Sequence, residues 1–189
     1  MNKELIINAA PQGVEIALLE DKKLVELHHE KVDASFAVGD LYLGKVKKLI
    51  PGLNAAFVDV GFEKDAFLHY TDLSPYARSL LKFTQSCISD NTPTGLDFAQ
   101  FQVEPEIVKT GKINEVLSGK PNILVQILKE PIAAKGPRLS CELSLPGRFV
   151  VVTPFNDIVA VSRKIHSADE RKRLHKIIEA IKPKNFGVI

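Results

Sequence analysis

The side chains with the clearest potential for chemistry are aromatic and basic, and they fall in strand-like runs between residues 55 and 69. Because successive side chains of a strand point to opposite faces, small aliphatic residues share one face there, while Phe57, Phe67 and His69 share the other. Lys45, in the preceding strand-like run, is expected beside them. Aromatic rings next to cations suit single-stranded nucleic acid, since every base can stack and every phosphate is charged. The alternative is that both phenylalanines belong to the core, where this residue type is usually found.

Residues that could support hydrolysis or bind a metal are not grouped in this sequence. Asp40, Asp59 and Asp65 stand apart near expected turns or strand faces, without the paired carboxylates that hold Mg²⁺ near a phosphate. The two cysteines, Cys87 and Cys141, lack metal-ligand spacing and are expected to be reduced thiols. We therefore predict no catalytic residue, no metal site and no cofactor within these 189 residues.

Composition and charge indicate an ordinary globular chain with a basic C-terminal part. Hydrophobic residues make up 45% of the 189 positions, which is enough to build a core. No apolar run approaches the ~20 residues of a membrane helix, and the charged start does not resemble a secretory leader, so we expect a cytoplasmic protein without a membrane partner. Residues 148–189 hold nine basic and four acidic side chains, a net charge of about +5, which is compatible with a nearby phosphate backbone.

Strand-like runs separated by turn residues predict a mainly β chain with some α-helix, divided into three regions. Residues 1–37 are expected to form a meander of three strands, and residues 38–144 a five-stranded antiparallel barrel with a long loop at 74–120. Residues 145–189 are expected to form a truncated α+β subdomain, because the final strand-like run stops abruptly. Its helix should begin at Ser167, which opens a capping box.

Local patterns within these regions give further expectations. A short helix is predicted over 77–83, and two strands over 149–152 and 158–161. The loose segment between this helix and the next barrel strand should dock on the barrel through its phenylalanines, including Phe98 and Phe101.

The barrel segments resemble a known RNA-binding type. The motifs Gly44-Lys45-Val46, Ala55–Gly61 and Ala66–His69 stand in the order typical of the OB-type domain named after the first protein of the small ribosomal subunit. Loops at the mouth of such barrels grip the nucleic acid strand. Lys135 and Gly136 lie in a predicted loop of this kind, between the last two barrel strands.

Further segments extend this likeness over most of the chain. Together with Ala55–Gly61 they resemble, in sequence order, the N-terminal part of the ribonuclease E/G family, and they are Glu4–Asn8, Leu124–Ile127 with Lys135–Leu139, Leu145–Phe149 and Val161–Ile165.

This resemblance implies that the chain is the RNA-binding part of a bacterial endoribonuclease that acts on single-stranded RNA in RNA processing and decay. It implies RNA contacts by Phe57, Phe67 and Lys135, with His69 and Lys45 nearby. It also implies that residues 1–37 are part of a ribonuclease-H-like subdomain and that residues 145–189 begin a sensor of the RNA 5′ end. The Mg²⁺-binding aspartates would lie downstream, so this fragment is expected to be non-catalytic and its parent enzyme to be a homo-oligomer.

Two positions depart from the family pattern. Leu43 stands where a lysine often occurs and Val60 where an aromatic residue can occur, and both changes are expected to weaken RNA binding without abolishing it. The alternative interpretation is a free-standing single-stranded RNA-binding protein that acts in translation or ribosome assembly.

Overall fold

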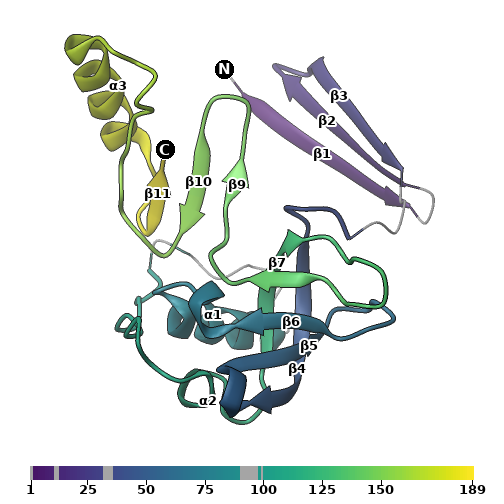
Figure 1. The fold of residues 1–189 in the computed structure, drawn as a ribbon. Helices are drawn as coiled ribbons and strands as arrows, with labels where there is room; N and C mark the ends of the chain where they lie inside the picture. The colour runs from purple at the N-terminus through teal and green to yellow at the C-terminus, as the bar shows by residue number, and fades with distance from the viewer. Residues whose placement is uncertain (1, 11–12, 32–35, 90–97, 99) are drawn as a thin grey trace. The chain divides into compact units, whose positions relative to one another are not determined.

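The computed structural model describes residues 2–10, 13–31, 36–89, 98 and 100–189, in two compact units, Met1–Ser35 and Phe36–Ile189 (Figure 1). The predicted fold class is confirmed: the chain is mainly β with a few helices, and α and β elements follow a closed five-stranded barrel. Within the described residues, no helix is both long and apolar enough to cross a membrane.

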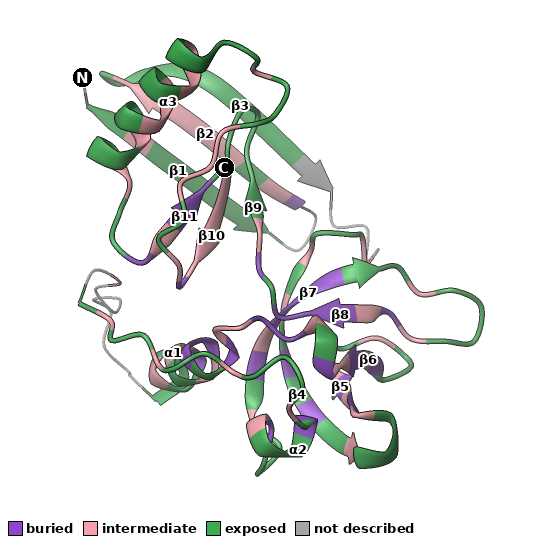
Figure 2. Ribbon diagram, turned by 60° about the vertical axis from the view of Figure 1, so that its left-hand side comes forward, coloured by how far each residue is buried: buried purple, intermediate pink, exposed green. Residues whose placement is uncertain are grey.

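The first unit is an antiparallel sheet of β1 (Lys3–Ala10), β2 (Gly13–Glu20) and β3 (Lys23–Lys31), which forms the predicted meander. Asp21 and Lys22 make the tight turn between β2 and β3 with positive φ angles of 47° and 66°, as a two-residue hairpin turn that follows the strand twist requires. Most described side chains of this sheet are exposed, so it buries little apolar surface by itself (Figure 2). Its likeness to a ribonuclease-H-like subdomain stays a prediction.

The second unit begins with a closed barrel of strand order β4-β5-β6-β8-β7. Its strands are β4 (Leu41–Ile50), β5 (Ala55–Asp59), β6 (Ala66–His69), β7 (Asn122–Lys129) and β8 (Arg138–Ser140). A ring of five strands cannot be antiparallel throughout, and β6 and β8 are the pair that runs parallel. Side chains that are at most 1% exposed fill the interior, among them Val46, Ala56, Val58, Ala66, Leu68, Ile123, Val125, Ile127 and Leu139.

The long insertion between β6 and β7 is partly helical and is tied to the barrel. It follows two short 3-10 turns of the barrel, η1 (Pro51–Leu53) and η2 (Tyr70–Asp72), and contains α1 (Ala77–Ser89) and α2 (Ile113–Val116). The predicted helix over 77–83 is therefore too short, since α1 continues to Ser89, and the Thr84 and Ser89 hydroxyls donate to the carbonyl oxygens of Leu80 and Gln85, four residues earlier. The predicted loop residues 90–97 and 99 lie outside the described part of the chain.

The C-terminal part forms a small sheet and one longer helix. The sheet has the order β11-β10-β9, with β9 (Leu145–Pro146), β10 (Val151–Pro154) and β11 (Phe186–Val188). The helix α3 (Ala168–Ile181) begins as predicted, since the Ser167 hydroxyl accepts a hydrogen bond from the Glu170 backbone N–H at 3.3 Å.

The two strands predicted in this part differ from those in the structure. The first, predicted over 149–152, is β10 and lies two residues later. The second, predicted over 158–161, is reduced to one parallel bridge between Val159 and Val188. The chain leaves the sheet at this point because the Arg171 guanidinium, on α3, binds the carbonyl oxygens of the next turn. Those carbonyls belong to Val161, Ser162 and Ile165. The predicted boundary between residues 144 and 145 stays a prediction.

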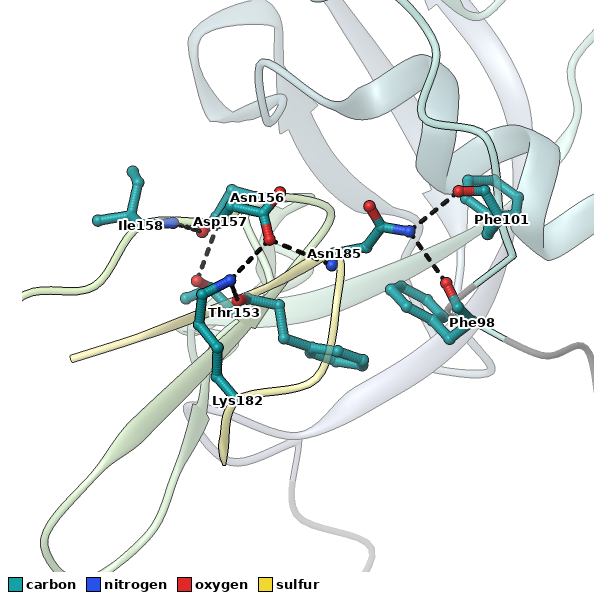
Figure 3. Close-up of polar contacts among 9 residues, drawn as sticks. Phe98, Phe101, Thr153, Asn156, Asp157, Ile158, Lys182 and Asn185 are labelled. Carbon is teal, nitrogen blue, oxygen red and sulfur yellow. Dashed lines mark hydrogen bonds and ion pairs between the residues drawn. The ribbon is translucent and has the colours of Figure 1, made fainter. Parts of the chain in front are cut away.

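A cluster of phenylalanines joins the insertion to the C-terminal sheet. The phenylalanines of the insertion pack against the barrel core as expected, but their rings also contact two phenylalanines near β10 and β11. The Phe cluster consists of Phe83, Phe98, Phe101, Phe155 and Phe186, with neighbouring ring centroids 4.4–5.9 Å apart. Asn185, which is only 6% exposed, donates from its side-chain amide to the carbonyl oxygens of Phe98 and Phe101 at 3.0 and 2.9 Å (Figure 3).

Candidate nucleic-acid interface

The aromatic pair lies on the outer surface of the barrel, where β5 and β6 are neighbours. Phe57 and Phe67 are directly opposite each other in the strand register, with ring centroids 6.0 Å apart and planes at 67°. The alternating aliphatic residues of these strands are buried in the barrel, whereas both rings are only half-buried. The two phenylalanines are therefore not sealed in the core, and the alternative that they are ordinary core residues does not hold.

His69 extends the aromatic surface along β6. Its ring is roughly parallel to that of Phe67, with centroids 6.4 Å apart and planes at 26°. The orientation of the imidazole is set by Thr71, whose backbone N–H donates to Nδ1 at 3.2 Å and whose hydroxyl oxygen lies 2.7 Å from the same nitrogen. This arrangement caps the 3-10 turn η2 and holds the imidazole beside Phe67.

Lys135 reaches the aromatic pair because its loop packs against the turn between β5 and β6. Gly136 is essential to this packing, since an added Cβ there would lie 2.8 Å from the Lys64 carbonyl oxygen and closer still to that of Asp65. The Pro137 carbonyl then accepts a hydrogen bond from the Phe67 backbone N–H at 2.8 Å. The loop is thereby fixed to β6, and a lysine that lies far from the aromatic pair in sequence is brought to its edge.

One open groove of about 600 Å³ lies on the barrel surface at this place, and His69 is not among the residues that line it. The predicted residues Phe57, Phe67 and Lys135 all belong to it. Three of its charged members were not predicted from the sequence: Lys64, Asp65 and Arg138. The groove is thus lined by two aromatic rings, three cations and one carboxylate, and the remaining lining residues are Ala134 and Gly136.

Arg138 is held at the groove by a buried carboxylate. Its Nε and one terminal nitrogen donate to the two Oδ atoms of Asp72 at 2.9 and 3.0 Å, and the hydrogen bonds and charge of Asp72 raise the pKa of the guanidinium. The Asp72 side chain is 10% exposed, whereas that of Arg138 is 40% exposed. A strong cation is therefore fixed in orientation and still reaches solvent.

Lys45 lies outside this groove. Its Cα is opposite those of Asp59 and Asn122, and an irregularity in β4 separates it from the position that faces Phe57. Asp59 pairs instead with Lys47 at 3.0 Å, and the Gly61 backbone N–H together with this lysine lowers the pKa of the carboxyl. A role for Lys45 and His69 in RNA contact stays a prediction.

Two other hollows have a chemistry less suited to single-stranded nucleic acid. The more enclosed one, of about 230 Å³, includes Glu106 and Glu142 in its lining and no lysine or arginine. The other lies along α3 and is basic, with Arg163, Lys172 and Lys176, but it has no Phe, Tyr or Trp for bases to stack on. Among the described residues, no three His, Cys, Asp or Glu side chains gather as metal ligands would.

Comparison with known proteins relates the chain to a family of nucleases. Residues 144–189 match a family model described as the ribonuclease E/G family. The chain is 36% identical to ribonuclease G of Haemophilus influenzae over 176 residues, and 34% identical to ribonuclease G of Escherichia coli strain K12 over 178 residues. These alignments cover 93% and 94% of this chain.

A third relative is ribonuclease E of Nostoc sp., 35% identical over 195 aligned residues that cover 100% of this chain. The chain spans only part of each of these proteins: 32% of the length of both ribonuclease G relatives and 23% of the length of ribonuclease E.

Proposed function

The chain belongs to the ribonuclease E/G family, and from that premise we propose that its barrel binds single-stranded RNA for an endoribonuclease. The observation that carries this proposal is the groove in which Phe57, Phe67 and Lys135 meet. Each ring offers a surface on which a base can stack, and each cation can contact a phosphate. Stacking tolerates any base, which agrees with a protein that handles single strands of varied sequence.

The parent enzyme would carry out phosphodiester hydrolysis with Mg²⁺ outside these 189 residues. In the described part of the chain, no three His, Cys, Asp or Glu side chains gather as metal ligands would, and Asp59, Asp72 and Asp157 each pair with a basic side chain. The role proposed for this chain is to capture and position the substrate. We also propose that the parent enzyme is cytoplasmic, assembles as a homo-oligomer and acts in bacterial RNA processing and decay.

The proposal is tested by the affinity of the purified chain for a short, labelled oligouridine. Phe57→Ala and Phe67→Ala should each weaken binding by about 1–3 kcal/mol, or about 5–150-fold, which is the usual loss of one stacked base. Circular dichroism and urea unfolding should show that both variants stay folded, since neither ring fills the barrel interior. Leu53→Ala is the matched control: it shortens an apolar side chain, 59% exposed, in the η1 turn of the same barrel, outside the groove lining, and should leave the affinity unchanged.

Two results would contradict the proposal. One is an affinity that does not change when both rings are removed. The other is wild-type binding that does not weaken as the salt concentration rises, since phosphate contacts release counterions. Mg²⁺-dependent cutting by the pure chain would refute the separate proposal that hydrolysis occurs elsewhere in the parent enzyme.

A further inference from the structure

An irregularity in β4 brings an unexpected lysine beside the aromatic pair. Val46 faces the barrel interior, and strict alternation would turn Lys48 inward as well. The register instead shifts between Val46 and Lys48, so that Lys48 lies directly opposite Phe57 and is exposed. A β-bulge of this kind inserts one extra residue and re-aims the side chains that follow it.

A matching bulge lies in β7. Ile127 is buried, and alternation would place Lys129 on its side of the strand. The register shifts between these two residues, and Lys129 is exposed opposite Arg138 on β8. Two bulges in different strands thus have the same result, which is to turn a lysine outward from the barrel.

Together the register pairs form one cross-strand row: Lys48, Phe57, Phe67, Arg138 and Lys129. Each member is opposite the next on a neighbouring strand, and neighbouring strands lie about 4.8 Å apart. The two rings therefore occupy the middle of the row, and a cation follows them on each side. From Lys48 to Arg138 the row extends about 14 Å around the barrel.

Lys47, the sequence neighbour of Lys48, does not belong to this row. Lys47 is the extra residue of the β4 bulge, and its ammonium pairs with Asp59 at 3.0 Å. Lys48 and Lys129 form no ion pair with any carboxylate of the described residues. Two neighbouring lysines of equal charge thus differ in whether that charge is already compensated.

We propose that a single RNA strand crosses the barrel along this row, with bases stacked on Phe57 and Phe67. The phosphates that flank these bases would contact Lys48 on one side and Arg138 with Lys129 on the other. Arg138 suits this role because Asp72 fixes its planar guanidinium, which has further N–H donors to offer a phosphate oxygen. This inference rests on the proposed RNA-binding function and specifies the path of the strand.

The test measures oligouridine affinity over a range of salt concentrations. Each lost phosphate contact should lower the slope of log K against log salt by about 0.7, the value for single strands. Lys48→Ala and Lys129→Ala are each expected to show this change, and the double variant about twice as much. Lys47→Ala is the matched control, since it removes the same charge from the same strand and should leave the slope unchanged.

The inference is overturned if Lys47→Ala lowers the slope as much as Lys48→Ala, because the attraction would then depend on net charge and not on the row. It is also overturned if Lys48→Ala and Lys129→Ala leave the slope unchanged. If that happens while Phe57→Ala still weakens binding, the proposed RNA-binding function stands and only the path is wrong. If the wild-type chain does not bind single-stranded RNA, both proposals fail.

Discussion

Replacing Asn185 by alanine should loosen the junction between the barrel insertion and the C-terminal sheet. The Asn185 amide holds the carbonyl oxygens of Phe98 and Phe101, and its own backbone is in the left-handed region with φ of 64°. Alanine keeps neither property, because it has no amide to donate and tolerates this backbone conformation poorly. The side chain is almost fully buried, so water replaces the lost donor only if the junction opens.

The magnitude follows from these two losses. Two hydrogen bonds contribute about 0.5–1.5 kcal/mol each, or about 1–3 kcal/mol together. The left-handed conformation adds about 1 kcal/mol for alanine, because its Cβ crowds the next carbonyl oxygen. We therefore expect Asn185→Ala to destabilise the junction by about 2–4 kcal/mol. Asn185→Gly loses the same hydrogen bonds without the backbone strain, so the difference between the two variants reports that strain less the larger chain entropy that glycine loses on ordering.

Limited proteolysis with chymotrypsin measures this effect at Phe101. Where opening is fast compared with cleavage, the cleavage rate follows the open population, and a loss of about 2–4 kcal/mol raises that population about 30–900-fold. Asn122→Ala, at an exposed asparagine of the barrel, is the control and should match the wild type. If Asn185→Ala is cut at the wild-type rate, the Asn185 hydrogen bonds do not hold the junction and the reasoning is refuted.

Two further predictions concern the groove and the thiols. Gly136→Ala should lower stability by about 1–3 kcal/mol, the usual cost of overpacking, and weaken oligouridine binding because Lys135 moves with the loop; unchanged urea unfolding and affinity would contradict the packing described. Cys141 is fully buried, which raises the pKa of its thiol, whereas Cys87 is exposed. Ellman's reagent should therefore modify one thiol per folded chain and two in denaturant, and two fast thiols in the native protein would contradict this.

Local patterns predicted much of the fold. Period-two alternation correctly placed Phe57 and Phe67 outside the barrel, because the aliphatic residues between them had to be buried. The capping motif correctly predicted the start of α3, since the Ser167 hydroxyl accepts from the Glu170 backbone N–H, while the Glu170 carboxylate pairs with Arg173. Helix length was predicted less well: α1 continues to Ser89, although most of its side chains beyond Thr84 are exposed and leave no apolar pattern to read. A resemblance carried by short motifs supplied the family and added Lys135 to the candidate site.

The outward-facing side chains of each regular strand are therefore readable from the sequence, because alternation is a local property of the backbone. Which of these side chains meet depends on the tertiary fold. Arg138 lies beside Phe67 because β6 and β8 pair in parallel, and Lys48 faces Phe57 because a bulge interrupts the alternation. Strand pairing and bulges depend on how the ring of five strands closes, and that closure is set by contacts between segments distant in sequence.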